Sequence, residues 1–210
     1  MENLSGHEIT SYLIESKSSN IKHILEDPNL HTDKYIFHIE QFIQPNICDW
    51  IVYECERYAH QNNGWNTSRH KQYPTTDLPI RSIIPLTNYL HNFIILNVFP
   101  LIGERFKLNM NFIHIKDLFV VNYRYDRQLG LDYHKDGGIV SCNILLNNKT
   151  DFTGGGTTFI CENHEKHYSI NKGDMLLHCG MITHKGNEII CGERYVLIGF
   201  FGYMRDYHLI

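Results

Sequence analysis

The chain has 210 residues, which suits one domain with a sizeable hydrophobic core and is short for two full domains. Hydrophobic residues make up 42% of the sequence and charged residues 20%, so collagen-like, low-complexity and broadly disordered classes are excluded. The net charge of -4 provides no basic surface for a phosphate backbone. We therefore expect no nucleic-acid partner.

The N-terminal residues MENLSGHEIT contain no basic region followed by an apolar one, so no secretory signal is visible. The location is therefore unknown, with the cytoplasm as the default expectation and a luminal or viral-factory location as the alternative. The longest apolar stretch, 93–102, contains Asn97 and Pro100 and is too short to cross a membrane. None of the six cysteines forms a CxxC pair, so we expect no zinc ribbon. Because no secretory signal is visible, we expect the cysteines to be free thiols.

Residues 1–105 are expected to form a mainly helical support region. Directly after Pro45, apolar residues recur every three or four positions over 47–58, which predicts a helix with one buried face. The same spacing predicts a second helix over 86–98. Pro100 should kink or end that helix, because proline has no N–H to donate.

Residues 106–205 are expected to form the β core. Five short runs there are rich in β-branched and aromatic residues and are bounded by turn-forming residues, namely 112–125, 139–147, 155–162, 174–179 and 194–203. Their spacing is typical of an antiparallel sandwich or of a jelly-roll barrel. The sequence therefore predicts a single α+β domain over 1–210 that is mainly β.

One candidate metal site stands out among the 14 histidines. His134 and Asp136 lie two positions apart, so on an extended segment their side chains point the same way and can bind one ion together. His184 follows a glycine-bounded strand further along. Two histidines and one carboxylate form the facial triad typical of non-haem Fe(II), which leaves coordination positions open for chemistry. Manganese or zinc remain alternatives for this donor set.

A second histidine and aspartate pair at the same spacing, His31 and Asp33, is a decoy. In a chain with so many histidines, chance alone is expected to produce such a match. This pair lacks a downstream histidine in a comparable strand context. We expect it to form a solvated turn in which Asp33 accepts hydrogen bonds from the backbone.

Three further residues have polar side chains on otherwise apolar strand faces. Arg194 shares its face with valine, isoleucine and phenylalanine, and a buried guanidinium needs an anion. That anion is either an internal carboxylate or the distal carboxylate of a dicarboxylic cosubstrate. Asn143 is either a hydrogen-bonding core residue or part of the same site. Tyr123 either packs in the core or offers its hydroxyl to that carboxylate.

Six segments occur in one order along the chain: YPTTDLPI (73–80), VVNYRYD (120–126), YHKDGGIVSCNILLNN (133–148), FTGGGTTF (152–159), KGDMLLHCGMITHKG (172–186) and CGERYVLIGFF (191–201). Together they resemble the catalytic domain of procollagen lysyl hydroxylases. Those enzymes belong to the iron(II) and 2-oxoglutarate dioxygenase superfamily, which also contains the prolyl 4-hydroxylases.

The resemblance implies a double-stranded β-helix, a jelly-roll or cupin-like core, flanked by N-terminal helices. It implies Fe(II) held by His134, Asp136 and His184, with 2-oxoglutarate as cosubstrate and ascorbate (vitamin C) as reductant. The implied activity is hydroxylation of peptidyl lysine to 5-hydroxylysine in collagen-like partners, with release of succinate and CO2, by a homodimer. The alternatives are a peptidyl prolyl hydroxylase, or another protein hydroxylase of this superfamily, and a catalytically silent collagen-binding module.

The resemblance also implies roles for individual residues. Arg194 and Tyr123 would bind the 5-carboxylate of 2-oxoglutarate, and Asn143 would lie near its metal-chelating end. His178 matches a histidine of the family and would either shape the pocket or serve a structural role. A lysine substrate would be attracted by acidic groups near the entrance, for which the candidates are Asp77, Asp126 and Asp132.

Overall fold

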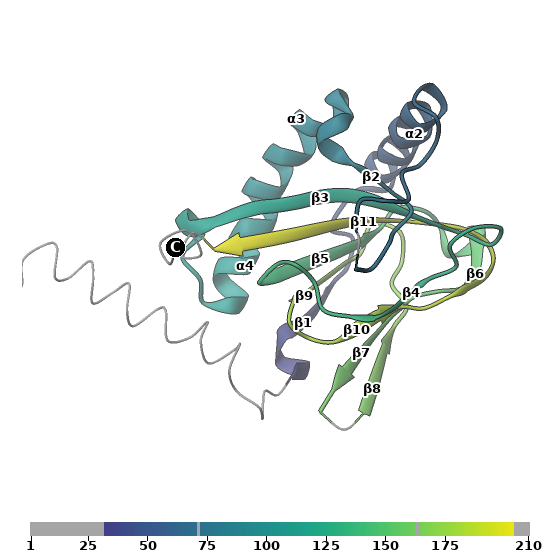
Figure 1. Cartoon of the computed structure of the whole chain (residues 1–210). Coiled ribbons are helices and arrows are strands. Elements are labelled where there is room, and N and C mark those ends of the chain that lie inside the picture. Colours follow the sequence, from purple (N-terminus) through teal and green to yellow (C-terminus); the bar gives the residue numbers. More distant parts are fainter. Residues whose placement is uncertain (1–31, 71, 163, 204–210) are drawn as a thin grey trace, which may run out of the picture.

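The computed structural model describes residues 32–70, 72–162 and 164–203. Two antiparallel sheets form the body of this part, and helices cover the outer face of the larger one (Figure 1). Within these ranges the larger sheet has seven strands: β1 (Ile36–Ile39), β9 (Met175–Cys179), β5 (Val140–Leu145), β11 (Ile189–Tyr203), β3 (Ile113–Arg124) and β2 (Asp77–Pro79) in spatial order, with β6 (Phe152–Gly154) paired to β11.

The smaller sheet consists of β4 (Leu131–His134), β10 (His184–Gly186), β7 (Thr157–Cys161) and β8 (His164–Tyr168) in spatial order. From β8 onward the chain alternates between the two sheets, since β8 and β10 lie in the smaller one and β9 and β11 in the larger. The arrangement is a jelly roll. It confirms the predicted mainly β domain, and of the two predicted alternatives it is the jelly roll.

The helices follow the sequence pattern, with one difference at Pro100. The chain does not stop being helical there, because a wider π turn over Ile94–Val98 precedes the proline and places it in the first turn of the next helix. A proline in a first turn needs no N–H partner. The helices are α2 (Pro45–Gln61), α3 (Ile84–Phe93) and α4 (Phe99–Phe106), and short 3-10 turns lie at Thr32–Tyr35, Ile80–Ser82, Met110–Phe112 and Lys149–Asp151.

The first half also contributes strands to the larger sheet. β1 pairs with β9, and β2 pairs with β3, so segments far apart in the sequence close both edges of that sheet. The helical support region predicted over 1–105 is therefore interleaved with the β core. The division of one domain at residue 105 stays a prediction.

All five strands expected in the second half are confirmed as β3, β5, β7, β9 and β11. The sequence pattern did not reveal β4, β6, β8 and β10. Three of these have only three or four residues, and β8 reads HEKHY, with mainly charged and exposed side chains. Such segments lack the apolar alternation that marks a half-buried strand.

Two neighbouring strands present one face to the interior between the sheets. Alternate residues point the same way along a strand, so Val121 and Tyr123 of β3 share a face, as do Arg194, Val196 and Ile198 of β11. The antiparallel register places Arg194 directly opposite Tyr123. The fold therefore brings the polar ends of both strands together within an apolar wall.

Asp174 fastens the turn before β9 to the segment after β1. Its carboxylate accepts hydrogen bonds from the backbone N–H of Gln41 and of Asn171, both at 2.9 Å, and lies 3.0 Å from Nε2 of His38. Burial raises the pKa of Asp174, but these hydrogen bonds and the nearby imidazole outweigh it, so the pKa is lowered overall.

We expect Asp174→Asn to lower the free energy of unfolding at pH 7 by about 2 kcal/mol. Because the folded pKa lies below the unfolded value, the carboxylate stabilises the fold above the unfolded pKa of about 3.9, and this contribution is lost as the pH falls through the folded pKa. Urea unfolding at pH 7 and near pH 3 measures both effects. The exposed Asp126→Asn is the matched control, and an equal loss in the two variants would refute the assignment.

Within the described ranges no helix is long and apolar enough to cross a membrane. All six cysteines are free thiols, and only Cys191 is exposed.

Candidate metal and cosubstrate site

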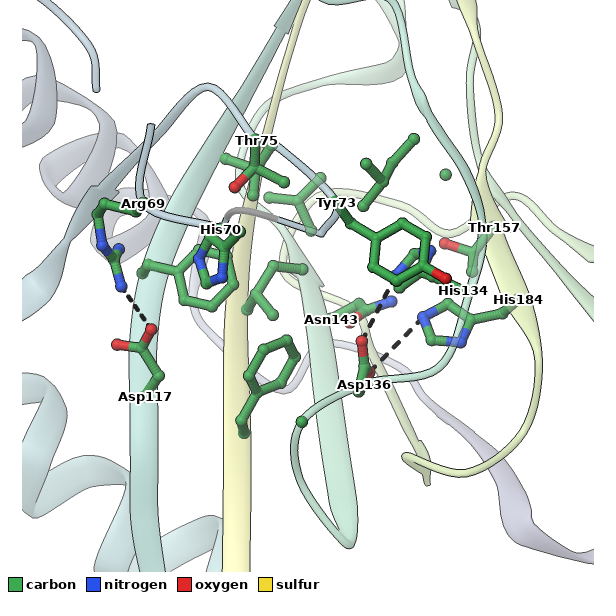
Figure 2. A pocket seen from close by; sticks show the side chains of 18 of the residues that line it. Arg69, His70, Tyr73, Thr75, Asp117, His134, Asp136, Asn143, Thr157 and His184 are labelled. Atoms are coloured by element: carbon green, nitrogen blue, oxygen red, sulfur yellow. Dashed lines mark hydrogen bonds and ion pairs between the residues drawn. The ribbon is translucent and has the colours of Figure 1, made fainter. Parts of the chain in front are cut away.

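The smaller sheet brings the three predicted metal ligands together. His134 ends β4 and His184 begins β10, and the antiparallel pairing places them directly opposite each other. Asp136 follows in the loop after β4, where its backbone N–H donates to the carbonyl of Gly180 at 2.9 Å. Ligand atoms from the three side chains all lie within 4.8 Å of one another. Figure 2 shows these side chains converging at one side of the pocket.

Hydrogen bonds to the backbone orient both imidazoles. Nδ1 of His134 lies 2.7 Å from the carbonyl oxygen of Asp132, and Nδ1 of His184 lies 2.9 Å from that of Ile182. A carbonyl oxygen can only accept, so Nδ1 carries the proton in both rings. In the neutral form of each ring, this tautomer leaves the lone pair of Nε2 facing Asp136, as in a metal-binding histidine.

The contacts among these side chains fit a bound cation better than a hydrogen-bonded cluster. Nε2 of His134 and Nε2 of His184 lie 3.5 and 3.6 Å from the carboxylate oxygens of Asp136, which is too long for charge-assisted hydrogen bonds. Oδ2 of Asp136 is buried without a hydrogen-bond partner. Two nitrogen lone pairs and a buried carboxylate oxygen thus share one space, and a divalent transition metal suits that donor set.

A layer of buried rings supports the ligands from behind. His178 of β9 is fully buried, with Nε2 3.8 Å from Oδ2 of Asp136. The centroid of its ring lies 4.7 Å from that of His184, and the ring of Phe159 stacks on His184 with the centroids 5.3 Å apart. Burial lowers the pKa of His178 to about 4, so the ring is neutral at pH 7. His178 lies behind the ligands and does not line the pocket.

The pocket is a cavity of about 700 Å³ between the two sheets. Arg194 lines it, and the residue is only 3% exposed. No carboxylate of the described residues forms an ion pair with Arg194, so this part of the chain provides no internal salt bridge for it. Burial lowers the pKa of its guanidinium, yet arginine keeps its proton throughout the physiological range. The cavity therefore presents a buried cation that needs an anion from outside.

Tyr123 and Asn143 line the same cavity. The guanidinium carbon of Arg194 lies 5.5 Å from the centroid of the Tyr123 ring. Burial raises the pKa of Tyr123, which keeps its hydroxyl protonated and able to donate. Asn143 of β5 is 7% exposed and makes no side-chain hydrogen bond to any described residue. The structure thus gathers the predicted metal and cosubstrate residues around one cavity.

None of the three acidic residues predicted to lie near the cavity entrance lines the cavity. Asp77 is fully buried and bound to Arg69 at 2.6 Å, so its carboxylate cannot attract a substrate from solution, and this prediction is corrected. Asp126 pairs with Arg124 at 2.9 Å on an outer turn. Neither Asp126 nor the exposed Asp132 lines the cavity, although the backbone of Asp132 orients His134.

The decoy pair cannot be compared as a unit, since His31 lies outside the described residues. Asp33 lies in a 3-10 turn and is half-exposed, with His164 at 3.9 Å and Lys166 at 3.8 Å. No metal-ligating group is formed by Asp33 within the described ranges.

Sequence reasoning missed several residues of the cavity wall, among them Tyr73, Arg69 and Asp117. Tyr73 contacts the ring of His134, with the ring centroids 5.3 Å apart. Arg69 and Asp117 lie at the opposite side and form an ion pair at 2.5 Å (Figure 2). Tyr73 lies inside YPTTDLPI (73–80), one of the six segments that carry the family resemblance, so the sequence could have indicated it. Nothing in the local sequence indicates that Arg69 or Asp117 lines a cavity.

Comparison with known proteins agrees with this site. Residues 115–202 match the model of the 2OG-Fe(II) oxygenase superfamily, a range that contains the three metal-binding candidates and Arg194. The chain therefore contains a 2OG-Fe(II) oxygenase domain. It is similar to procollagen-lysine,2-oxoglutarate 5-dioxygenase 2 of Homo sapiens, with 31% identity over 163 residues that cover 73% of this chain. The chain spans only 22% of the length of that protein.

Solved structures of other proteins share the fold, and two prolyl hydroxylases are among them. A prolyl hydroxylase from Trichoplax adhaerens, in complex with a hypoxia inducible factor peptide fragment, has a TM-score of 0.62 at 12% identity and covers 93% of this chain and 94% of its own. The viral collagen prolyl hydroxylase of Paramecium Bursaria Chlorella virus-1 has a TM-score of 0.60 at 14% identity, with coverages of 84% and 93%. At such identities the likeness concerns the fold alone.

Proposed function

We propose that this domain is an Fe(II)- and 2-oxoglutarate-dependent dioxygenase that hydroxylates C5 of peptidyl lysine in collagen-like sequences, releasing succinate and CO2. The observation that carries the proposal is one cavity that holds both the ligand set of His134, Asp136 and His184 and the unpaired, buried guanidinium of Arg194. Similarity to procollagen-lysine dioxygenases over 73% of the chain supports lysine as the target.

The two histidines and Asp136 would hold Fe(II), which when bound supplies the oxygen activation that amino-acid side chains lack. Arg194 binds the distal carboxylate of 2-oxoglutarate through two parallel N–H donors, and the Tyr123 hydroxyl donates to the same group. Asn143 orients the chelating end of the cosubstrate. The apolar residues Val121 and Val196 between these groups exclude water, which strengthens the ionic contacts.

Two further features belong to the proposal through the same resemblance. Ascorbate would keep the metal reduced, and two copies of the chain would form a homodimer. Succinate formation with and without ascorbate tests the first feature, and light scattering on the eluting protein tests the second.

A peptidyl proline is the second candidate target. Solved structures of similar fold include proteins named as prolyl hydroxylases, and the cavity wall formed by Phe119, Ile198 and Phe200 is apolar enough to contact a pyrrolidine ring. A catalytically silent collagen-binding module would have no need of an unpaired buried arginine beside three convergent ligands.

We expect a lysine-bearing collagen-like peptide to gain the mass of one oxygen atom when incubated with the chain, Fe(II), 2-oxoglutarate and ascorbate. Tandem mass spectrometry locates the oxygen, and succinate should appear in equal amount. A matched peptide carries Gly-X-Pro repeats and no lysine. Oxygen on proline alone would replace the lysine proposal with the second candidate, and no succinate with either peptide would contradict both.

A further inference from the structure

A loop held by ionic contacts crosses one wall of the cavity. We name residues 64–70 and 72–76, between α2 and β2, the mouth loop. Asn66 exchanges two backbone hydrogen bonds with Asp77, at 2.8 and 3.1 Å. The Arg69 guanidinium bridges Asp77 at 2.6 Å and Asp117 at 2.5 Å, which ties the loop to β2 and to β3.

The other end of the mouth loop is fixed by hydrogen bonds to Gln128. The backbone N–H of Thr76 donates to Oε1 of Gln128 at 2.6 Å, and Nε2 of Gln128 donates to the carbonyl of Pro74 at 3.0 Å. Thr75 also donates to the buried carboxylate of Asp77 at 2.5 Å. These bonds hold the backbone directly after Tyr73 in a defined place.

From that position the side chain of Tyr73 packs against the metal-binding candidate His134. Its ring centroid lies 5.3 Å from that of His134, at an interplanar angle of 41°. Figure 2 shows the hydroxyl directed toward the side of the pocket where Thr157 and His184 lie. The hydroxyl makes no hydrogen bond to any described residue, and the side chain is 39% exposed. Part of the ring is thus left open to a ligand.

A bound lysine would bring a positive charge to this place. Only one carbon separates C5 from the ammonium nitrogen, so a lysine that presents C5 at the metal site also presents its charge there. Among the described residues, two carboxylates line the cavity, Asp136 and Asp117. Asp136 is a metal-binding candidate. Asp117 is paired with Arg69 and lies about 20 Å along β3 from Tyr123.

We infer that Tyr73 is a specificity-determining residue whose ring face binds the ammonium group of the target lysine. An aromatic face attracts a cation within about 6 Å, and the contact strengthens where water is excluded. Aromatic recognition also avoids placing a second carboxylate beside Asp136, which would compete for the metal. The inference rests on the proposed function, because a neutral target residue would gain nothing from this contact.

The test compares binding of two peptides that differ only in charge. One carries lysine and the other norleucine, and calorimetry is performed on the full chain with Fe(II) and 2-oxoglutarate under anaerobic conditions. We expect Tyr73→Leu to weaken binding of the lysine peptide about tenfold and that of the norleucine peptide less than about twofold. Tyr73→Phe keeps the ring and should bind both peptides as the parent does. Tyr53→Leu, which changes an exposed tyrosine on α2 away from the cavity, is the control.

The outcomes separate the inference from the function on which it rests. If Tyr73→Leu weakens both peptides equally, the ring acts by shape, and if it weakens neither, the ring is no subsite; both results overturn the inference alone. A higher KM for 2-oxoglutarate in Tyr73→Leu would also overturn the inference, because the ring would then act on cosubstrate binding. A parent chain that hydroxylates no lysine overturns the proposed function and the ammonium contact together.

Discussion

Replacing Asp136 with alanine is expected to lower 2-oxoglutarate turnover by about 100-fold or more and to abolish Fe(II) binding. Loss of a residue that only orients a metal ligand already costs about 10- to 100-fold in metal affinity or activity, and Asp136 would supply the single anionic ligand. Its removal leaves two neutral imidazoles at the site. The remaining pair, His134 and His184, cannot balance the charge of a divalent ion in a buried cavity.

The same substitution is not expected to unfold the metal-free protein. Oδ2 of Asp136 is buried without a hydrogen-bond partner, so its removal leaves no hydrogen-bond donor of the metal-free fold unpaired at that oxygen. In the parent chain Fe(II) should raise the melting temperature by mass action, whereas in Asp136→Ala it should not. Differential scanning fluorimetry with added Fe(II) measures this difference independently of turnover.

Asp132→Ala is the matched control for Asp136→Ala, because both residues flank His134 and the side chain of Asp132 is exposed. Only the backbone of Asp132 contacts His134, and alanine keeps it. We expect turnover and metal binding within about twofold of the parent. Succinate formation that survives in Asp136→Ala would show that the metal binds elsewhere.

The metal site could be predicted from the sequence because its signals are local. His134 and Asp136 share one short segment, and the glycine-rich turns around His184 mark the start of a strand. β-branched and aromatic runs also marked β3, β5 and β11, whose interiors are apolar enough to show in the sequence. The direct pairing of His134 with His184 was not accessible, because β4 and β10 are too short and polar to be recognised.

The cavity wall opposite the metal could not be predicted, because its contacts are tertiary. The sequence places Asp77 next to a loop, which suggests solvent, but Arg69 folds over it and buries the carboxylate. The second partner of that arginine, Asp117, comes from β3. The sequence does not show which residue a charged side chain will pair with. The burial and pairing of Asp77 follow only from the packing of the mouth loop against β2 and β3.

Replacing Arg194 with methionine is expected to raise the KM for 2-oxoglutarate by about 100-fold, which corresponds to about 2.7 kcal/mol. Charge-assisted bidentate hydrogen bonds in a buried cavity supply energy of this size. Methionine has a similar length and no charge, and Arg194 has no carboxylate partner in the described chain whose charge would be left unpaired. We therefore expect the variant to be at least as stable as the parent in urea.

Arg194→Lys separates charge from geometry. Lysine keeps the positive charge but loses the planar fork, so the KM should rise by about tenfold and not 100-fold. The decisive comparison uses 2-oxovalerate, which lacks the distal carboxylate. The parent should strongly prefer 2-oxoglutarate, whereas Arg194→Met should turn over both 2-oxo acids with similar kcat/KM, as CO2 release would measure. If Arg194→Met kept the parent's preference, another cation would have to bind that carboxylate, and the role of the buried guanidinium would be structural.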